Sequence, residues 1–240
     1  MRSSTVWTAG LAVCLAVHLY ATWADSDGLF VVSKLLLMPL LGLVVWTETT
    51  RLSLLYVAAL ALSWLGDAFL LGPRIGFAEG SSGYFLLGLS AFLLAHVCYL
   101  LRCRRLGARL SGPQRARDAS TKPALLALAA WLLAVATGHV WNIEQGLYVP
   151  AALYAAVILL MLVHVWQLSP KPVLPKGANF PRIVSLRLGA LLFVCSDALI
   201  GASVFGPLDN GAFPVRCGIM TLYVAGQYGL RHLAAGAGSE

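Results

Sequence analysis

Residues 52–72 read LSLLYVAALALSWLGDAFLLG, and residues 187–205 read RLGALLFVCSDALIGASVF. Both stretches are apolar and long enough to cross a bilayer, which takes about 20 residues as an α-helix. Each stretch nevertheless carries one aspartate, Asp67 or Asp197. A carboxylate in hydrocarbon costs about 2.5–3.5 kcal/mol on insertion scales, so an aspartate inside the membrane indicates a functional site. These stretches therefore indicate a membrane protein and suggest where its site lies.

The composition extends this interpretation to the whole chain. Of the 240 residues, 59% are hydrophobic and 11% are charged, whereas a soluble domain carries roughly 25% charged residues. The first apolar run is longer than the ~7–15 residue core of a signal peptide, so we interpret it as a retained span. We predict an all-α polytopic membrane protein, residues 1–240 forming one domain with eight transmembrane helices. The predicted spans are 5–24, 29–46, 52–72, 84–101, 123–140, 147–168, 187–205 and 213–233.

The basic residues predict the orientation of the chain. The net charge is +7, and most Lys and Arg side chains fall in loop 102–122, in the loop before residue 187, and beside the two termini. Cytoplasmic loops are enriched in Lys and Arg, so both termini are predicted to be cytoplasmic. A bacterial inner membrane and an endoplasmic reticulum membrane both fit this pattern. The basic loops also suit anionic membrane lipids, and nucleic acid is not an expected partner.

The two aspartate stretches suggest an internal repeat. The pentapeptide at 66–70, GDAFL, is similar to SDALI at 196–200, and His96 precedes Gln227 by a nearly equal interval. Four spans separate the members of each pair, so the two halves would form a 4+4 parallel repeat. Chance similarity between low-complexity helices is the alternative explanation. A true repeat would place both aspartates at matching depth, facing one central cavity.

Helix geometry places the polar residues of several spans at similar depths. At ~1.5 Å rise per residue, Asp67 and Lys34 lie roughly 8 Å and Asp197 roughly 12 Å below the outer boundary. Small residues accompany both aspartates on their helix faces, which favours close packing with neighbouring helices. We therefore expect one cavity, open to the outer side, that collects the polar set. This set comprises Lys34, Asp67, His96, Asp197, Tyr223, Gln227 and Arg216.

Each member of this set also has a purely structural interpretation. Lys34 either pairs with a buried aspartate or extends to the membrane interface. His96 either serves the site or packs within the bundle, and the aspartates either do chemistry or link helices. Tyr223 and Gln227, four residues apart on one helix, line a cavity or make interhelical hydrogen bonds. The cysteines and histidines follow no metal-ligand spacing, so neither a metal nor another cofactor is expected.

An ordered set of short motifs extends from the second predicted span to the eighth. It comprises Ser33-Lys34, GDAFL at 66–70, AHVCY at 95–99, GALLFVCSD at 189–197, RCGIM at 216–220, Tyr223 and Gln227. In order and spacing, this set resembles the lysoplasmalogenase family, also called YhhN-like. The chain departs from the family pattern at Gly226, where an alanine is usual, and in its longer and more basic loop 102–122.

The resemblance implies hydrolysis of the vinyl ether bond of a lysophospholipid, lysoplasmalogen. The products would be a fatty aldehyde and glycerophosphocholine or glycerophosphoethanolamine. This chemistry needs an acid for the vinyl carbon, an anion beside the resulting cation, and a base for water, roles that two carboxylates in unlike environments can divide. We expect Asp197 to donate the proton and Asp67, paired with Lys34, to stabilise the cation; the reverse assignment is the alternative. Water or substrate would be oriented by His96, Tyr223 and Gln227, and phosphate would be held by Arg216.

Two other functions fit the same polar residues. Buried aspartates, a lysine and a histidine also form proton relays, and parallel repeats occur in carriers, so a proton-coupled transporter is the main alternative. A scaffold or lipid-sensing protein without turnover is the second alternative. Release of aldehyde from lysoplasmalogen by the purified protein distinguishes the hydrolase from both.

Overall fold

The computed structural model describes residues 2–72, 82–109, 145–168, 179–206, 208–209 and 211–235. Within these ranges the chain forms seven α-helices and a short 3-10 helix, which confirms the predicted all-α class. The fifth predicted span, 123–140, lies outside the described residues. The helices are α1 (Arg2–Trp23), α2 (Asp27–Glu48), α3 (Leu54–Leu70), α4 (Ser82–Arg109), α6 (Gln145–Gln167), α7 (Asn179–Val204) and α8 (Phe213–Leu230), followed by η3 (Arg231–Leu233).

Five of these helices are long and apolar enough to cross a membrane, namely α1, α2, α4, α6 and α7. α3 is shorter, with 17 residues. The chain is therefore a polytopic helical membrane protein, while the total of eight spans stays a prediction. Helix α4 continues beyond its predicted span to Arg109, and α7 begins before its span, at Asn179. A hydropathy pattern stops at the first charged residues, whereas the helical hydrogen bonds continue through them.

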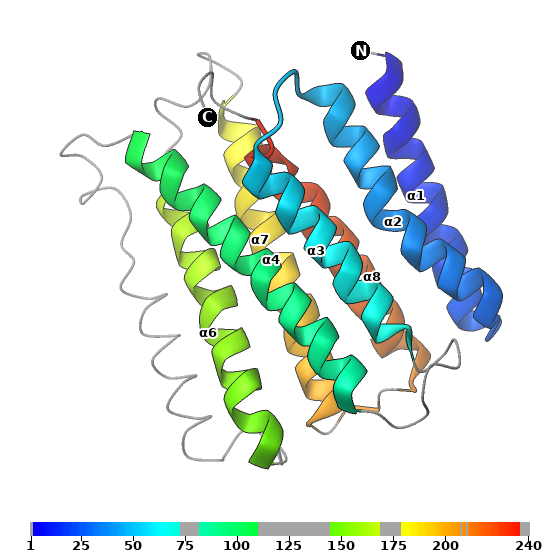
Figure 1. Ribbon diagram of the computed structural model, residues 1–240. Coiled ribbons are helices and arrows are strands. Elements are labelled where there is room, and N and C mark those ends of the chain that lie inside the picture. Colours follow the sequence, from blue (N-terminus) through cyan, green and yellow to red (C-terminus); the bar gives the residue numbers. More distant parts are fainter. Residues whose placement is uncertain are drawn as a thin grey trace.

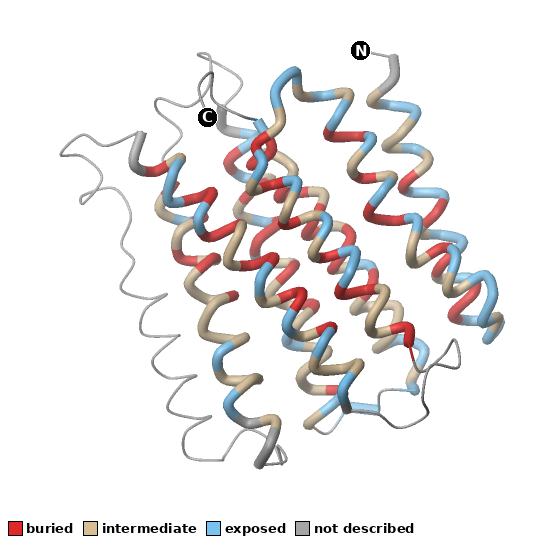
Figure 2. Tube along the Cα trace, in the orientation of Figure 1, coloured by how far each residue is buried: buried red, intermediate tan, exposed pale blue. Residues whose placement is uncertain are grey.

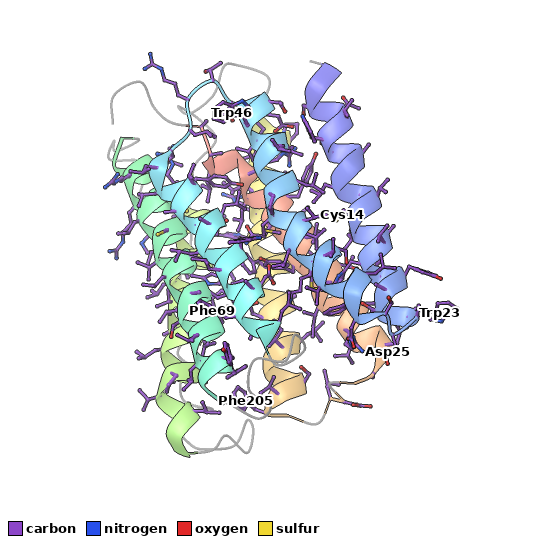
Figure 3. The ribbon with its side chains drawn as sticks, turned by 45° about the vertical axis from the view of Figure 1, so that its right-hand side comes forward. Cys14, Trp23, Asp25, Trp46, Phe69 and Phe205 are labelled. Carbon is purple, nitrogen blue, oxygen red and sulfur yellow. The ribbon has the colours of Figure 1, made fainter. Side chains whose placement is uncertain are left out.

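The surface of the helix bundle has the character of a lipid-facing surface. Large apolar side chains are exposed along α1 and α2, among them Val13, Val32 and Leu36. Trp23 and Trp46 are 68% and 70% exposed and lie at opposite ends of the α1–α2 hairpin (Figure 3). Tryptophans gather at the two membrane–water interfaces of membrane proteins, so the hairpin has the expected pattern of a pair of spans.

The helices form one bundle in which consecutive described helices run antiparallel, except for α4 and α6, which run parallel (Figure 1). Helices α1 and α2 form one side and α6 the other, with α3, α4, α7 and α8 between them. The closest pairs are α3 with α4, α7 with α8, and α1 with α2, and α4 also packs on α6. Buried residues concentrate on the facing sides of the central helices (Figure 2). Both aspartates belong to these central helices.

Glycines bring the helices of each central pair into close contact. A Cβ atom on Gly189 would lie 2.6 Å from the Gly229 Cα atom, so α7 and α8 touch through their backbones. A Cβ atom on Gly66 would lie 2.6 Å from the ring of Phe92 on α4. Because real Cβ atoms do not approach so closely, a larger residue at Gly189 would push the two backbones apart, and one at Gly66 would displace the Phe92 ring. The close packing expected from the small residues on the helix faces of the aspartates is thus present at both glycines.

The end of the bundle that carries both chain termini is closed by the C-terminal segment. Arg102 was predicted to lie in a loop, but it lies in α4 and is 1% exposed. Its Nε donates to the Leu233 carbonyl at 2.9 Å, and Nη2 donates to the Ala235 carbonyl. The Ser53 amide donates to the Ala234 carbonyl at 2.8 Å. The guanidinium can be buried here because the Leu233 and Ala235 carbonyls accept hydrogen bonds from it.

Candidate active site

Asp67 links three helices of the bundle. The side chain lies on α3 and is buried, with the residue 3% exposed. Lys34 Nζ on α2 is 3.4 Å from Oδ1 of Asp67, and the Tyr223 hydroxyl on α8 donates to Oδ2 at 2.8 Å. Each carboxyl oxygen therefore has its own partner. The Lys34–Asp67 pairing expected from the sequence is present, and Lys34 does not extend to the interface.

The helices around this ion pair are held in register by further hydrogen bonds. The indole of Trp64, one turn before Asp67, donates to the Leu35 carbonyl at 2.9 Å. The preceding residue on α2, Ser33, is 3.0 Å from Nδ1 of His18 on α1 through its hydroxyl. These contacts fix α2 between α1 and α3 at the level of Lys34. The position of the ammonium group is thus set by two neighbouring helices.

Gln227 lies one turn beyond Tyr223 on α8 and is fully buried. Its Nε2 donates to the Ser63 hydroxyl at 3.0 Å, and its Oε1 accepts from the Tyr99 hydroxyl at 2.7 Å. Ser63 is itself one turn before Asp67 on α3. The Gln227 amide therefore adds a second hydrogen bond between α8 and α3, one turn from the Tyr223–Asp67 bond, and it also binds α4 through Tyr99. Of the two interpretations from the sequence, this geometry is that of an interhelical hydrogen bond.

Asp197 has a different set of partners, from α4 and α6. The Tyr154 hydroxyl donates to Oδ2 of Asp197 at 2.5 Å, and Nε2 of His96 is 3.7 Å from the same oxygen. The Nδ1 atom of His96 is 2.7 Å from the Phe92 carbonyl, which can only accept a hydrogen bond. Nδ1 must therefore carry a proton, and in the neutral ring Nε2 keeps its lone pair. This lone pair is available close to the Asp197 carboxyl.

A group of aromatic rings lies between the two aspartate clusters. The Phe193 ring is 4.7 Å from the His96 ring on one side and 5.5 Å from the Tyr223 ring on the other, between ring centroids. The Phe92 ring packs edge-on against Tyr223 at 5.9 Å. We call Phe92 and Phe193 the aromatic partition. The aromatic partition packs against Tyr223 of one cluster and His96 of the other, and it occupies the space in which one shared polar cavity was expected.

A cavity of about 210 Å³ lies on the Asp197 side of the aromatic partition, between α4, α6 and α7 with Leu70 of α3. Asp197 and Tyr154 contribute its ionisable groups, and apolar side chains make up the rest of the wall. Of the predicted site residues, the cavity wall includes Asp197 alone. Asp67 and its partners lie behind the partition, which differs from the single outer cavity expected from the sequence. The wall comprises Leu70, Phe85, Leu89, Phe92, Ala151, Ala152, Tyr154, Ala155, Ile158, Leu159, Val194, Asp197, Ala198, Ile200, Gly201 and Phe205.

Arg216 lies on the other side of the bundle. Its guanidinium carbon is 5.3 Å from the centroid of the Phe30 ring on α2, whereas the cavity is walled mainly by α4, α6 and α7. The structure therefore places Arg216 against the α1–α2 hairpin and not among the cavity-lining residues. The guanidinium stacks on an aromatic face there, a contact that arginine favours.

Tyr154 is the site residue that sequence reasoning missed. It lies in a span that was interpreted only as apolar, and its partner Asp197 is 43 residues further along the chain, on α7. One signal was present in the sequence, because a tyrosine in an apolar helix needs a partner for its hydroxyl. The identity of that partner depends on which helices are neighbours. Among the described residues, no three His, Cys, Asp or Glu side chains gather in a way that would hold a metal ion.

The comparison with family models found one match. The model described as the YhhN family matches residues 29–234, which include both aspartate clusters and every wall of the cavity. The chain belongs to the YhhN family, the family of lysoplasmalogenases. Helix α1 precedes the matched region of this YhhN family member. No curated protein and no solved structure matched the chain in the other two comparisons.

Proposed function

We propose that this YhhN family member hydrolyses the vinyl ether bond of lysoplasmalogen to a fatty aldehyde and glycerophosphocholine or glycerophosphoethanolamine. The observation that carries the proposal is Asp197, an acidic side chain in the wall of a cavity whose lining is apolar apart from Asp197 and Tyr154. No Lys or Arg among the described residues is within ion-pair distance of Asp197, whereas Lys34 pairs with Asp67. An isolated carboxyl in apolar surroundings favours its neutral form, and this form can donate a proton.

The proposed reaction begins with proton transfer from the Asp197 carboxyl to the vinyl carbon farther from the ether oxygen. The π electrons form the new C–H bond, and a lone pair of the ether oxygen completes the double bond of an oxocarbenium ion. Water adds to the cationic carbon and returns a proton to Asp197, which gives a hemiacetal. Transfer of the hemiacetal proton to the glycerol oxygen breaks the C–O bond and releases the aldehyde. One water is consumed, and Asp197 ends in its starting form.

His96 is proposed to assist the addition of water. Its Nε2 atom keeps a lone pair because Nδ1 donates to the Phe92 carbonyl. Nε2 has no hydrogen-bond partner among the described residues and lies 3.7 Å from Oδ2 of Asp197. A water between the substrate and this nitrogen would have an acceptor for its proton. Nε2 would then pass this proton to Oδ2 of Asp197, so His96 is proposed as the relay that returns the proton of the water to the acid.

Asp67 is proposed to act from outside the cavity. Its ion pair with Lys34 carries no net charge, so the direct stabilisation of the substrate cation that we expected from the sequence is not favoured by this geometry. The pair instead holds α2 and α3 together, and Tyr223 attaches α8 to them. Tyr223 in turn contacts both rings of the aromatic partition. Asp67 thus supports one wall of the site.

The test of this function is aldehyde release by purified protein in detergent micelles. Lysoplasmalogen should give fatty aldehyde, and the acyl and saturated alkyl lysophospholipids should give none because they lack the vinyl ether. We expect Asp197→Asn to lower kcat by about 10²–10⁴-fold, the usual contribution of general acid catalysis. Asp209→Asn, at an exposed carboxyl away from the cavity, is the matched control.

Two outcomes would contradict the proposal. If the wild-type protein releases no aldehyde but moves protons and a solute across the membrane of sealed vesicles, it is a proton-coupled transporter and not a hydrolase. Full activity of Asp197→Asn would remove Asp197 from the chemistry while leaving the hydrolase function in place.

The orientation of the chain is also proposed from the position of its charges. The end of the bundle that carries both termini (Figure 1) also carries the described basic residues of α4 and the start of α7, for example Arg104, Arg105 and Arg182. Asp25, Asp27 and Asp209 lie at the other end. Because Lys and Arg favour the cytoplasmic side, both termini are proposed to be cytoplasmic. Alkaline phosphatase fused at residue 208 should be active, and the same fusion at the C-terminus should be inactive.

A 4+4 parallel repeat is supported by the contacts of the two aspartates. Asp67 on α3 is contacted from α2 and α8, and Asp197 on α7 is contacted from α6 and α4. A shift of four helices converts each set of contacts into the other. A second pair of contacts follows the same interval, because 130 residues separate Gly66 from Ser196 and 131 separate Gly88 from Ile219. A Cβ atom on Gly88 would lie 3.3 Å from the Gly66 carbonyl oxygen, and the Ser196 hydroxyl donates to the Ile219 carbonyl. An experimental structure in which residues 123–140 do not form a helix would contradict the repeat.

A further inference from the structure

We propose that Tyr154 is a positioning residue for the acid of the site, holding one oxygen of Asp197 so that the other faces the cavity. This inference rests on the proposed function. It assigns a role to a residue on α6 that neither the sequence motifs nor the ion pair at Asp67 indicated. The tyrosine acts through Asp197 and does not itself exchange a proton with the substrate.

The division of labour between the two carboxyl oxygens supports this role. Oδ2 of Asp197 accepts the hydrogen bond of Tyr154 at 2.5 Å and is also the atom nearest to Nε2 of His96, at 3.7 Å. Oδ1 has no hydrogen-bond partner among the described residues, and the Asp197 side chain keeps 10% exposure in the cavity wall. The carboxyl is thus bound on its buried oxygen and open on the other.

Without this bond the carboxyl would have freedom to rotate. An aspartate on a helix has several staggered side-chain rotamers, and Tyr154 supplies the one hydrogen bond to Asp197 from the described part of the chain. The tyrosine ring is itself fixed, because it packs edge-on against His96 with 5.4 Å between ring centroids. The same contact keeps the His96 ring beside Oδ2. A rigid phenol therefore orients both groups that take part in the proposed proton transfers.

The kinetic signature of a positioning residue is a loss of turnover without a loss of substrate binding. Tyr154→Phe removes a hydroxyl and keeps the ring that lines the cavity. We expect kcat to fall roughly 10- to 100-fold, as for the loss of a hydrogen bond to an ionisable group, with KM changed less than about 3-fold. Binding of a saturated alkyl lysophospholipid, a non-hydrolysable analogue, should be unchanged. A residue that only shapes the cavity would instead change KM and analogue binding.

The matched control is Tyr56→Phe. Tyr56 is also buried, at 1% exposure, and its hydroxyl has no hydrogen-bond partner among the described residues. Because Tyr56 lies outside the cavity wall, this control should keep both kcat and KM. Comparison of the two variants isolates the bond to Asp197 from the general effect of removing a buried hydroxyl.

Infrared spectroscopy tests the bond without reference to activity. The carboxyl C=O stretch of Asp197 is the band that disappears in Asp197→Asn. We expect this band to move to higher frequency in Tyr154→Phe and to stay in place in Tyr56→Phe. If Tyr154→Phe does not fold, 3-fluorotyrosine at position 154 keeps the side-chain shape and strengthens the donor, so the band should move to lower frequency.

The outcomes separate this inference from the proposed function. Wild-type protein that releases no aldehyde would overturn the hydrolase, whereas a shifted infrared band would still establish the bond. An active wild type together with a Tyr154→Phe variant of equal kcat would overturn the role of Tyr154 alone. A band that does not move on either substitution at position 154 would overturn the bond itself.

Discussion

Asp67 and Asp197 lie in similar pentapeptides but in unlike surroundings. One oxygen of Asp67 pairs with the Lys34 ammonium and the other accepts from the Tyr223 hydroxyl, so a neighbouring positive charge balances the charge of the carboxylate. Asp197 has a phenol and a histidine near a single oxygen, and its other oxygen is open. At the scale of single residues, these unlike partners support the structural role proposed for Asp67 and the reactive role proposed for Asp197.

The structural role of Asp67 predicts a large effect on stability. Asp67→Asn leaves the Lys34 ammonium buried without a counter-charge, and we expect the free energy of unfolding to fall by about 3–5 kcal/mol. Denaturant unfolding in detergent measures this loss. The double variant Lys34→Met with Asp67→Asn removes both charges and should recover most of the stability. Equal stability of Asp67→Asn and the wild type would contradict the structural role.

At this scale, the sequence predicted one pairing of buried polar residues correctly and did not predict the others. Lys34 and Asp67 were paired correctly because few charges exist in the spans and opposite charges must meet. Gln227 and Arg216 were expected at the site, but the structure gives Gln227 two side-chain partners and stacks Arg216 on Phe30. Their positions depend on which helices are adjacent, and a single helix pattern does not contain that information.

At the scale of elements, small side chains on α6 and α7 create the cavity. Ala151, Ala155 and Ala198 leave space that larger residues would fill. The sequence predicted the described helices because spanning length and hydropathy are local properties. The cavity could not be predicted in the same way, since it is the volume left over when three separate helices meet.

This origin of the cavity predicts that one larger side chain blocks the site. Ala155→Leu should raise KM about 10-fold or more, because the added carbons occupy space needed by the substrate, while the cavity gives them room without unfolding the helix. Ala156→Leu, at the next residue of α6 and outside the cavity wall, is the control. Lysoplasmalogen kinetics and thermal unfolding of both variants provide the measurements. An unchanged KM in Ala155→Leu would show that the substrate does not use this cavity.

At the scale of the whole molecule, α4 is connected to the end of the chain. Arg102 donates to the carbonyls of Leu233 and Ala235, and Ser53 donates to Ala234 between them. Helix α4 also supplies His96 to the site, two turns before Arg102. The C-terminal segment and His96, the proposed proton relay, are therefore held by the same helix.

Removal of this guanidinium should destabilise the molecule as a whole. Arg102→Leu leaves two carbonyls without their donor, and we expect a cost of about 1–3 kcal/mol in the free energy of unfolding. Arg105→Leu, an exposed arginine of the same helix, should have little effect. Thermal unfolding in detergent compares the two variants. A larger loss in Arg105→Leu would contradict the importance of the C-terminal contacts.

The Arg102 contacts also have a consequence for biosynthesis. The Leu233 carbonyl follows Arg102 by 131 residues, and ribosomes add about 5–20 residues per second. Arg102 is therefore synthesised roughly 7–26 s before the residues whose carbonyls accept its hydrogen bonds. During this interval neither the Leu233 carbonyl nor the Ala235 carbonyl can accept a hydrogen bond from Arg102. The hydrogen bonds between α4 and the C-terminal segment therefore form only after the other described helices have been synthesised.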